Sequence, residues 1–182
     1  MRMLAIAVLL SATAAHAEVP LPFADIPSAS VAWYDVTGAT SAEIRTSMDA
    51  ARPRDPNDGS AVDGLTSWEF KVSWQTDERG TCVASLEDLH FSATVHVPRL
   101  VGANIPPEVR ARFDRFLASL LAHEDGHVRN AWDHRGDVAA AINAAGCSGA
   151  ARAAQRATNA IAAQDVAYDK ATDHGRTTIV SF

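Results

Sequence analysis

The sequence predicts an α+β fold in which a small antiparallel sheet packs on a long two-helix hairpin. Two observations predict it. In the first half of the chain, apolar and polar residues alternate in short stretches, as is typical of half-buried strands. From about Pro106 to about Thr172, apolar residues recur every three to four positions, as is typical of amphipathic helices. The chain therefore divides into a strand-rich half and a helical half.

The N-terminus has the features of a secretory signal peptide. A positively charged start precedes the apolar run 4–10, and Ala15-His16-Ala17 fits a small-x-small cleavage site. The apolar run is too short to span a bilayer. We expect cleavage of residues 1–17 after Ala17, and a secreted or periplasmic protein without stable membrane insertion. Residues 18–30, which contain several prolines, are expected to be extended, and residues 31–182 to form a single domain.

Composition limits the classes of partner and the redox compartment. Cleavage would leave 182 − 17 = 165 residues, enough for one domain with its own core. Loss of Arg2 would change the formal charge from −6 to −7, and the absence of a basic cluster argues against nucleic acid as a partner. Cys82 and Cys147 are expected to form a disulfide in an exported chain, with two buried thiols as the alternative. The sequence leaves the oligomeric state open.

The strand-rich half is expected to begin with a strand at residues 31–36. Thr40 and Glu43 have the Thr-x-x-Glu spacing of a capping box, which predicts a short helix running to about Ala51. Residues 53–64 are rich in Pro, Asn, Asp and Gly and are expected to form a loop.

Two further strands are expected where apolar residues occupy every second position, at residues 68–74 and 89–97. Pro98 is expected to end the second of them, because proline cannot donate to a strand ladder. Strands this close in sequence usually pair as antiparallel neighbours.

The helical half is expected to form an antiparallel hairpin. Pro106-Pro107-Glu108 places proline and an acid in the first turn of a long helix, whose period continues to Gly146. A second helix is expected from a cap at Ser148 to about Thr172, with Gly175 after its end. The tight turn between them would set the two helices side by side.

His123-Glu124-Asp125-Gly126-His127 matches the H-E-x-x-H motif of zincins. On a helix, residues four positions apart lie about 40° apart around the axis and about 6 Å along it, so both imidazoles reach one Zn²⁺. Glu124 lies on the adjacent flank and can take a proton from metal-activated water. The motif predicts a Zn²⁺ cofactor, His123 and His127 as ligands, and Glu124 as the general base.

A third protein ligand is expected, because catalytic zinc usually has three. If the hairpin turn is centred on Cys147, Asp125 lies 147 − 125 = 22 residues before it and Asp169 lies 169 − 147 = 22 residues after it. The last turns of the second helix should therefore lie level with the motif. His174 is the preferred third ligand, and Asp169 is either the alternative ligand or a group that orients a ligand histidine. The remaining alternatives are Asp133 and His134.

Tyr168 lies on the same stretch of the second helix. Its phenol is expected to donate to the oxyanion of a tetrahedral intermediate. Plain packing in the core is the alternative role.

Five segments in order resemble the bacterial domain-of-unknown-function family 922, described as secreted Zn-dependent proteases. The segments are Trp33-Tyr34-Asp35-Val36-Thr37-Gly38, Asp55-Pro56-Asn57-Asp58-Gly59 with Thr66-Ser67-Trp68, Phe91-Ser92-Ala93-Thr94-Val95, His123-Glu124-Asp125-Gly126-His127, and Tyr168-Asp169-Lys170-Ala171-Thr172-Asp173-His174-Gly175. The resemblance implies export and zinc-protease activity. It also implies that the last segment is functional.

We therefore expect a secreted zinc-dependent peptidase that hydrolyses a peptide or protein substrate. Glu124 and Tyr168 would be catalytic, and His123, His127 and His174 would hold the metal. One alternative is a non-catalytic, exported zinc-binding or envelope-associated protein, whose site would be closed by four protein ligands. The other is a zinc-dependent hydrolase of cell-wall amides.

Overall fold

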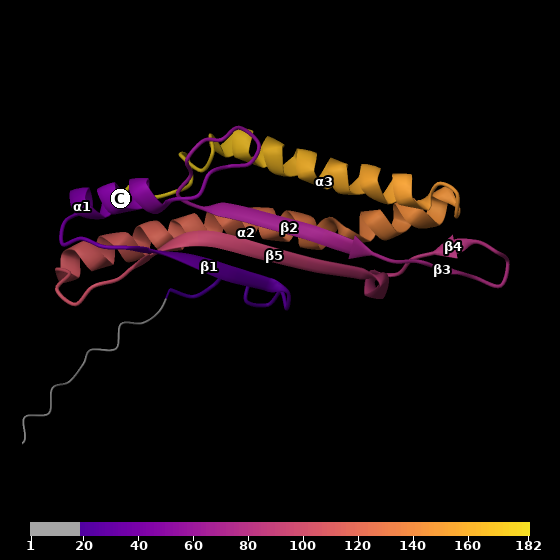
Figure 1. Cartoon of the computed structure of the whole chain (residues 1–182), viewed down its shortest axis with the longest axis horizontal. Coiled ribbons are helices and arrows are strands. Elements are labelled where there is room, and N and C mark those ends of the chain that lie inside the picture. The colour runs from indigo at the N-terminus through magenta and orange to yellow at the C-terminus, as the bar shows by residue number, and fades with distance from the viewer. Residues whose placement is uncertain (1–18) are drawn as a thin grey trace, which may run out of the picture.

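The computed structural model describes residues 19–182, so the expected signal peptide lies outside the described residues. A three-stranded sheet packs on one of two long helices, the second helix packs on the first, and a two-stranded ribbon extends from one end (Figure 1). The elements are β1 (Ala29–Val36), α1 (Ser41–Ala51), β2 (Leu65–Val72), β3 (Gln75–Thr76), β4 (Cys82–Val83), the 3₁₀ turn η1 (Leu86–Asp88), β5 (Leu89–Leu100), α2 (Pro107–Ala145) and α3 (Ala150–Thr172). Among residues 19–182, no helix combines the length and the apolar composition that crossing a membrane requires.

The sheet is mixed, so the prediction of a purely antiparallel sheet was wrong. The strand order is β1-β5-β2. β2 runs antiparallel to β5, as expected, whereas β1 runs parallel to it. α1 and β2 lie between β1 and β5 in the sequence, and a connection of that length can return the chain to the same end of the sheet. The tendency of sequence neighbours to pair antiparallel therefore holds for β2 and β5 only.

β5 continues through Pro98 to Leu100, beyond its expected end. The β2 ladder reaches only to the pair Leu65–His96, so on that side no β2 carbonyl needs an N–H from Pro98. The parallel ladder to β1 runs on to the pair Val36–Leu100. Pro98 is tolerated in the central strand β5 because, at this position, β5 has no partner among residues 19–182 on the β2 side of the sheet.

The capping box predicted at the start of α1 is confirmed. The Thr40 side chain accepts from the Glu43 N–H, and the Glu43 carboxylate accepts from the Thr40 N–H. Ile44 and Met48 of this helix are completely buried. The helix ends at Ala51, as the pattern predicted.

The segment before β1 was expected to be extended, but residues 22–28 form turns. Phe23 and Ile26 are 1% and 2% exposed, so the segment is anchored in the core. Arg129 of α2 also donates to both carboxylate oxygens of Asp25, at 2.8 and 3.3 Å. Apolar burial and a charged contact thus hold this segment against the domain.

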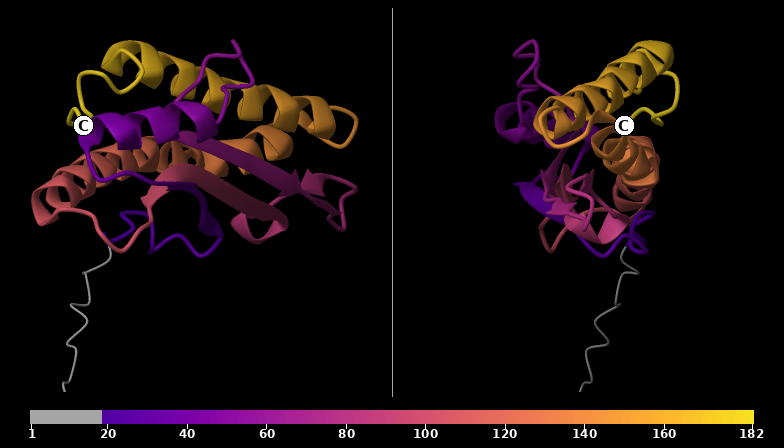
Figure 2. Two further views of the ribbon diagram at one scale, coloured as in Figure 1. Left: turned by 60° about the vertical axis from the view of Figure 1, so that its left-hand side comes forward. Right: turned by 90° about the vertical axis from the view of Figure 1, so that its right-hand side faces the viewer.

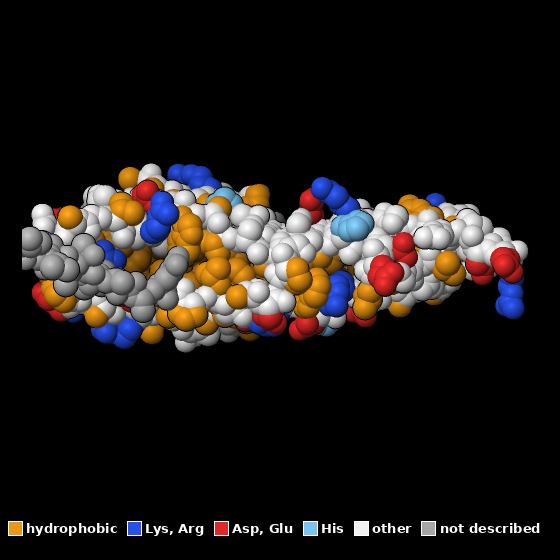
Figure 3. Space-filling view, turned by 90° about the horizontal axis from the view of Figure 1, so that it is seen from below, with side chains coloured by type: hydrophobic (Ala, Val, Ile, Leu, Met, Phe, Trp, Pro, Cys, Tyr) orange, Lys and Arg blue, Asp and Glu red, His pale blue; other side chains and the backbone are white. Residues whose placement is uncertain are grey.

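The core lies between the sheet and α2. The alternate residues of β5 that were expected to face inward are buried, and α2 covers them with its apolar stripe. Figure 2 shows the sheet, α2 and α3 in successive layers. Seen from below, the face on the β1 side carries scattered charges of both signs, and apolar side chains gather over the half where β1 lies (Figure 3). α2 is therefore the central layer, with one face on the sheet and another toward α3.

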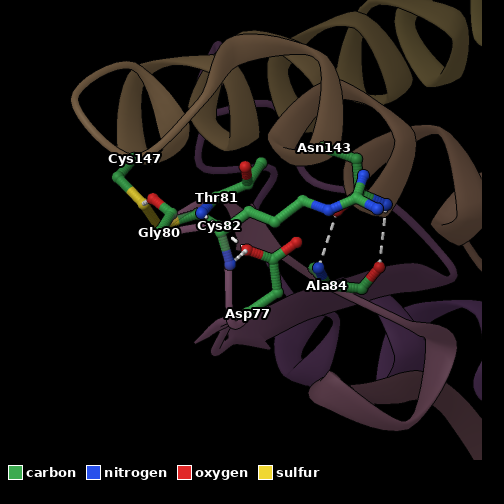
Figure 4. Close-up of a disulfide and its surroundings, with 8 residues drawn as sticks. Asp77, Gly80, Thr81, Cys82, Ala84, Asn143 and Cys147 are labelled. Carbon is green, nitrogen blue, oxygen red and sulfur yellow. Dashed lines mark hydrogen bonds between the residues drawn. A yellow bond between two sulfur atoms is a disulfide. The ribbon is translucent and has the colours of Figure 1, made fainter.

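The predicted disulfide Cys82–Cys147 is present and joins β4 to the turn between α2 and α3 (Figure 4). The Asn143 side chain pairs with the backbone of Ala84, accepting from its N–H at 2.7 Å and donating to its carbonyl at 3.0 Å. The β3–β4 ribbon was not predicted, because each strand has only two residues. α3 starts after Gly149 and lacks the expected side-chain cap from Ser148.

Candidate metal centre

The middle of α2 buries three polar side chains on one face. His123, Glu124 and His127 are 5%, 4% and 8% exposed. The imidazole centroids of the two histidines lie 5.2 Å apart, as the spacing of four residues requires. Buried polar groups are stable only with partners, and these partners come from α3 and β2.

α3 brings Asp169 level with the two histidines. Its Oδ1 lies 3.4 Å from Nε2 of His123 and 3.2 Å from Nε2 of His127. One potential ligand atom from each of the three residues lies within 4.8 Å of the others. These three residues could hold a metal ion, and two imidazoles with a carboxylate are donors that zinc and ferrous iron both accept.

His174 lies outside this group. Its backbone is left-handed, with φ of 52°, and its N–H donates to the Asp169 carbonyl at 2.7 Å. The side chain is exposed and lines the same cavity as the donor group. Its assignment as a ligand stays a prediction. The two lesser alternatives also lie elsewhere, since Asp133 is exposed and His134 contacts the Asn130 carbonyl.

Asp165 was missed by the sequence analysis. Its Oδ1 lies 3.3 Å from Nδ1 of His127 and accepts from the Asn130 amide at 2.7 Å. Its Oδ2 accepts from the Trp68 indole N–H at 2.6 Å. The available signal was the spacing of four between Asp165 and Asp169, which places both carboxylates on one helix face.

Two residues from the loop and strand opposite α2 lie against the Glu124 carboxylate. Thr66 donates to Oε2 at 2.7 Å. A Cβ on Gly64 would lie 2.4 Å from Oε1, so only glycine lets the chain approach the carboxylate this closely. Burial raises the pKa of Glu124, and the hydrogen bond from Thr66 opposes this shift. A carboxylate with a raised pKa is a stronger proton acceptor than an exposed one.

Tyr168 packs behind the histidines. Its ring stacks on His123 with centroids 5.1 Å apart and meets the edge of His127 at 5.0 Å. A Cβ on Gly126 would lie 2.7 Å from the phenol ring, which explains a glycine inside this helix. Burial raises the pKa of Tyr168, so the phenol stays protonated, and it contacts the His123 carbonyl at 3.4 Å. It is not among the residues that line the cavity, and its catalytic role stays a prediction.

The donor group carries compensating charges when no metal is bound. Burial alone would lower the pKa of His127, but hydrogen bonds to Asp165 and Asp169 outweigh it and raise the pKa to about 10. Burial alone would raise the pKa of Asp169, but hydrogen bonds from His123 and His127 hold it well below its usual range. The two carboxylates therefore stabilise positive charge at this point, which a metal cation can supply in place of protons.

A cavity of about 1030 Å³ gives access to the donor group. Its walls are the loop before β2, one face of α2, the end of α3 and the segment that follows α3. Val166 and Val180 line it and are 62% and 49% exposed, so the cavity reaches the surface. Phe116 and Leu120 also line it and add apolar surface to that of the polar donors. Such a mixture suits a ligand with both polar and apolar parts.

Comparison with known proteins found one family. The model of a family described as "Bacterial protein of unknown function (DUF922)" matches residues 31–175, from the third residue of β1 to the glycine after His174. No curated protein matched the chain. No solved structure matched it either.

Proposed function

The chain belongs to the DUF922 family of bacterial proteins of unknown function, and we propose that it is a zinc-dependent peptidase with Glu124 as the general base. One observation carries the proposal. A glutamate that is 4% exposed lies beside a His/His/Asp donor group and faces the same cavity. A structural metal site has no need of such a buried base. The disulfide is compatible with an exported enzyme.

His123, His127 and Asp169 would hold the zinc ion. When bound, zinc supplies a Lewis acid that polarises a carbonyl group and lowers the pKa of a coordinated water toward about 7. Catalytic zinc sites keep three protein ligands and one open position, whereas structural sites are closed by four. The three donors found within residues 19–182 fit the catalytic arrangement.

Glu124 moves the proton. Thr66 donates to Oε2, so we assign the proton transfer to the other carboxylate oxygen, Oε1. Oε1 accepts a proton from the attacking water, and the resulting carboxylic acid later gives that proton to the leaving amine. Burial assists the first step because it disfavours the charged carboxylate relative to the protonated form.

The cavity walls would hold the substrate. An unfolded peptide segment presents backbone amides and side chains of both kinds, which suits walls built from the loop before β2 and from apolar residues of α2 and the segment after α3. The segment that carries His174 also lines this cavity. We therefore propose peptides or unfolded proteins as the substrate class.

Metal analysis together with Glu124→Gln tests this function. We expect about one zinc per chain in both proteins, and a loss of about 10²- to 10⁴-fold in hydrolysis of a labelled, denatured protein by the variant. Glu108→Gln, an exposed glutamate in the first turn of the same helix, is the matched control and should hydrolyse at the parental rate. A parental protein without bound metal, or a Glu124→Gln variant as active as the parent, would overturn the proposal. A parental protein that binds iron and hydrolyses no protein substrate would also overturn it, since the donor set also accepts iron.

A further inference from the structure

One carboxylate, that of Asp165, connects three elements at the back of the donor group. It lies on α3, contacts His127 and Asn130 of α2, and accepts from Trp68 of β2. The Asp165 side chain is 17% exposed. Its contact with the imidazole is to Nδ1, whereas Asp169 contacts Nε2 of the same ring. Two carboxylates one helical turn apart thus meet opposite nitrogens of one histidine.

We propose that Asp165 is a positioning residue, which sets the tautomer and the ring orientation of His127 for metal binding. The inference rests on the metal site of the proposed function and is independent of proteolysis. An ionised carboxylate only accepts hydrogen bonds, so its partner Nδ1 must carry the hydrogen. Nε2 faces Asp169 and His123, and its lone pair would be available there once a metal displaces the proton that Nε2 shares with Asp169.

Asp165 can perform this role because its own orientation is determined by donors. The indole of Trp68 has only an N–H to offer. The Asn130 amide nitrogen donates both to Asp165 and to the Ile161 carbonyl, and two acceptors on one side of an amide require that the nitrogen faces them. Both oxygens of Asp165 are therefore occupied by N–H groups that belong to the sheet and to α2. Through Trp68 and Asp165, β2 thus helps to set the orientation of His127, the proposed metal ligand on α2.

The two histidines differ in this support. Nδ1 of His123 faces the Thr178 hydroxyl at 3.5 Å, a longer contact to an uncharged group in the segment after α3. Nδ1 of His127 faces a carboxylate that has two further donors. An imidazole that donates from Nδ1 to a carboxylate is a stronger metal ligand than one that donates to a hydroxyl. Removal of the Asp165 carboxylate should therefore weaken metal binding.

Asp165→Asn tests the inference through zinc affinity, measured by competition with a chromophoric chelator. An amide at position 165 must turn its NH₂ toward at least one of three N–H donors, so at least one hydrogen bond is lost. We expect zinc affinity to fall by about 10- to 100-fold. Asp137→Asn, an exposed carboxylate on α2, is the matched control and should bind zinc as the parent does.

Trp68→Phe gives the decisive second measurement. It removes the indole N–H and keeps an aromatic ring, so alone it should weaken zinc binding by less than Asp165→Asn does. Added to Asp165→Asn, it should partly restore affinity, because the amide NH₂ no longer faces an indole N–H. A residue that only filled space would show no such rescue. Nitrogen-15 NMR of the zinc-loaded parent should show His127 protonated at Nδ1.

The outcomes separate the two proposals. A parental protein that binds no zinc contradicts the proposed function together with this inference. If the parent binds zinc and Asp165→Asn binds it equally well, only the role of Asp165 is wrong. If Asp165→Asn fails to fold by circular dichroism, Trp68→Phe and the NMR spectrum decide alone. Unchanged zinc affinity in Trp68→Phe, with the His127 hydrogen on Nε2, would then reject the inference.

Discussion

The two ends of the α2–α3 pair are held together by different means. Where the helices connect, the Cys82–Cys147 disulfide and the Asn143–Ala84 hydrogen bonds join them to the β3–β4 side of the domain. Where α3 ends, the contacts to α2 are imidazoles and carboxylates, with Tyr168 packed among them. At the connected end, these links are a covalent bond and hydrogen bonds between uncharged groups. At the other end, the links join ionisable groups, so their strength should change with pH and with any bound metal, as is expected where stability is exchanged for function.

The largest effect on metal binding is expected from a change in the donor group itself. Asp169→Ala removes a proposed ligand and should weaken zinc binding by more than about 100-fold, since the loss of a ligand exceeds the 10- to 100-fold effects of groups behind ligands. His174→Ala should weaken it by less than about tenfold if the residue only lines the cavity. Chelator competition measures both. The reverse order of the two effects would establish His174 as the third ligand, as the sequence first predicted.

At the connected end, the expected effect is on folding and not on metal. Paired Cys82→Ser and Cys147→Ser changes should lower the free energy of unfolding by about 4 kcal/mol, because the disulfide closes a loop of 65 residues. Zinc affinity should stay within about threefold of the parent, since this end contains no donor. Urea unfolding and chelator competition are the two measurements. A large loss of zinc affinity would show that the two ends are coupled.

Two glycines of α2 differ in the space around them. Gly126→Ala places a methyl group 2.7 Å from the Tyr168 ring, and overpacking of this kind costs about 1–3 kcal/mol. Gly136→Ala meets only a Leu86 methyl at 3.9 Å, so helix propensity should stabilise the protein by about 0.5–1 kcal/mol. Thermal unfolding of both variants should therefore give opposite signs. Equal stabilisation would show that Tyr168 can move away from the donor group.

The pH dependence should differ between the metal-free and zinc-bound protein. Because the folded pKa of His127 is raised to about 10, its charged form stabilises the metal-free fold below the ordinary pKa of about 6.5. That contribution is lost as pH rises toward 10. Zinc must displace the same proton, so its affinity should rise by up to about tenfold per pH unit over this range. Thermal unfolding with chelator and with zinc, from pH 6 to 10, tests this. A zinc-induced stabilisation that does not change with pH would contradict it.

Local features of the sequence determined several parts of this protein. The capping box at Thr40 predicted the start of α1, and a spacing of four predicted that His123 and His127 share one face of α2. The centre of the hairpin turn predicted that Asp169 lies level with the motif. Each of these follows from the geometry of one helix or one turn, which the neighbouring residues alone specify.

Only the tertiary structure decided what surrounds these groups. The parallel pairing of β1 depends on a long connection, and no periodicity encodes it. Thr66 reaches Glu124 across 58 positions, and Trp68 reaches Asp165 across 97. The same packing brings Asp169 to the histidines and leaves His174 exposed in the wall of the cavity, and the spacing along α3 could not distinguish these two residues. The physical reason is that spacing along a helix determines direction, whereas a partner on another element is determined by how the layers pack.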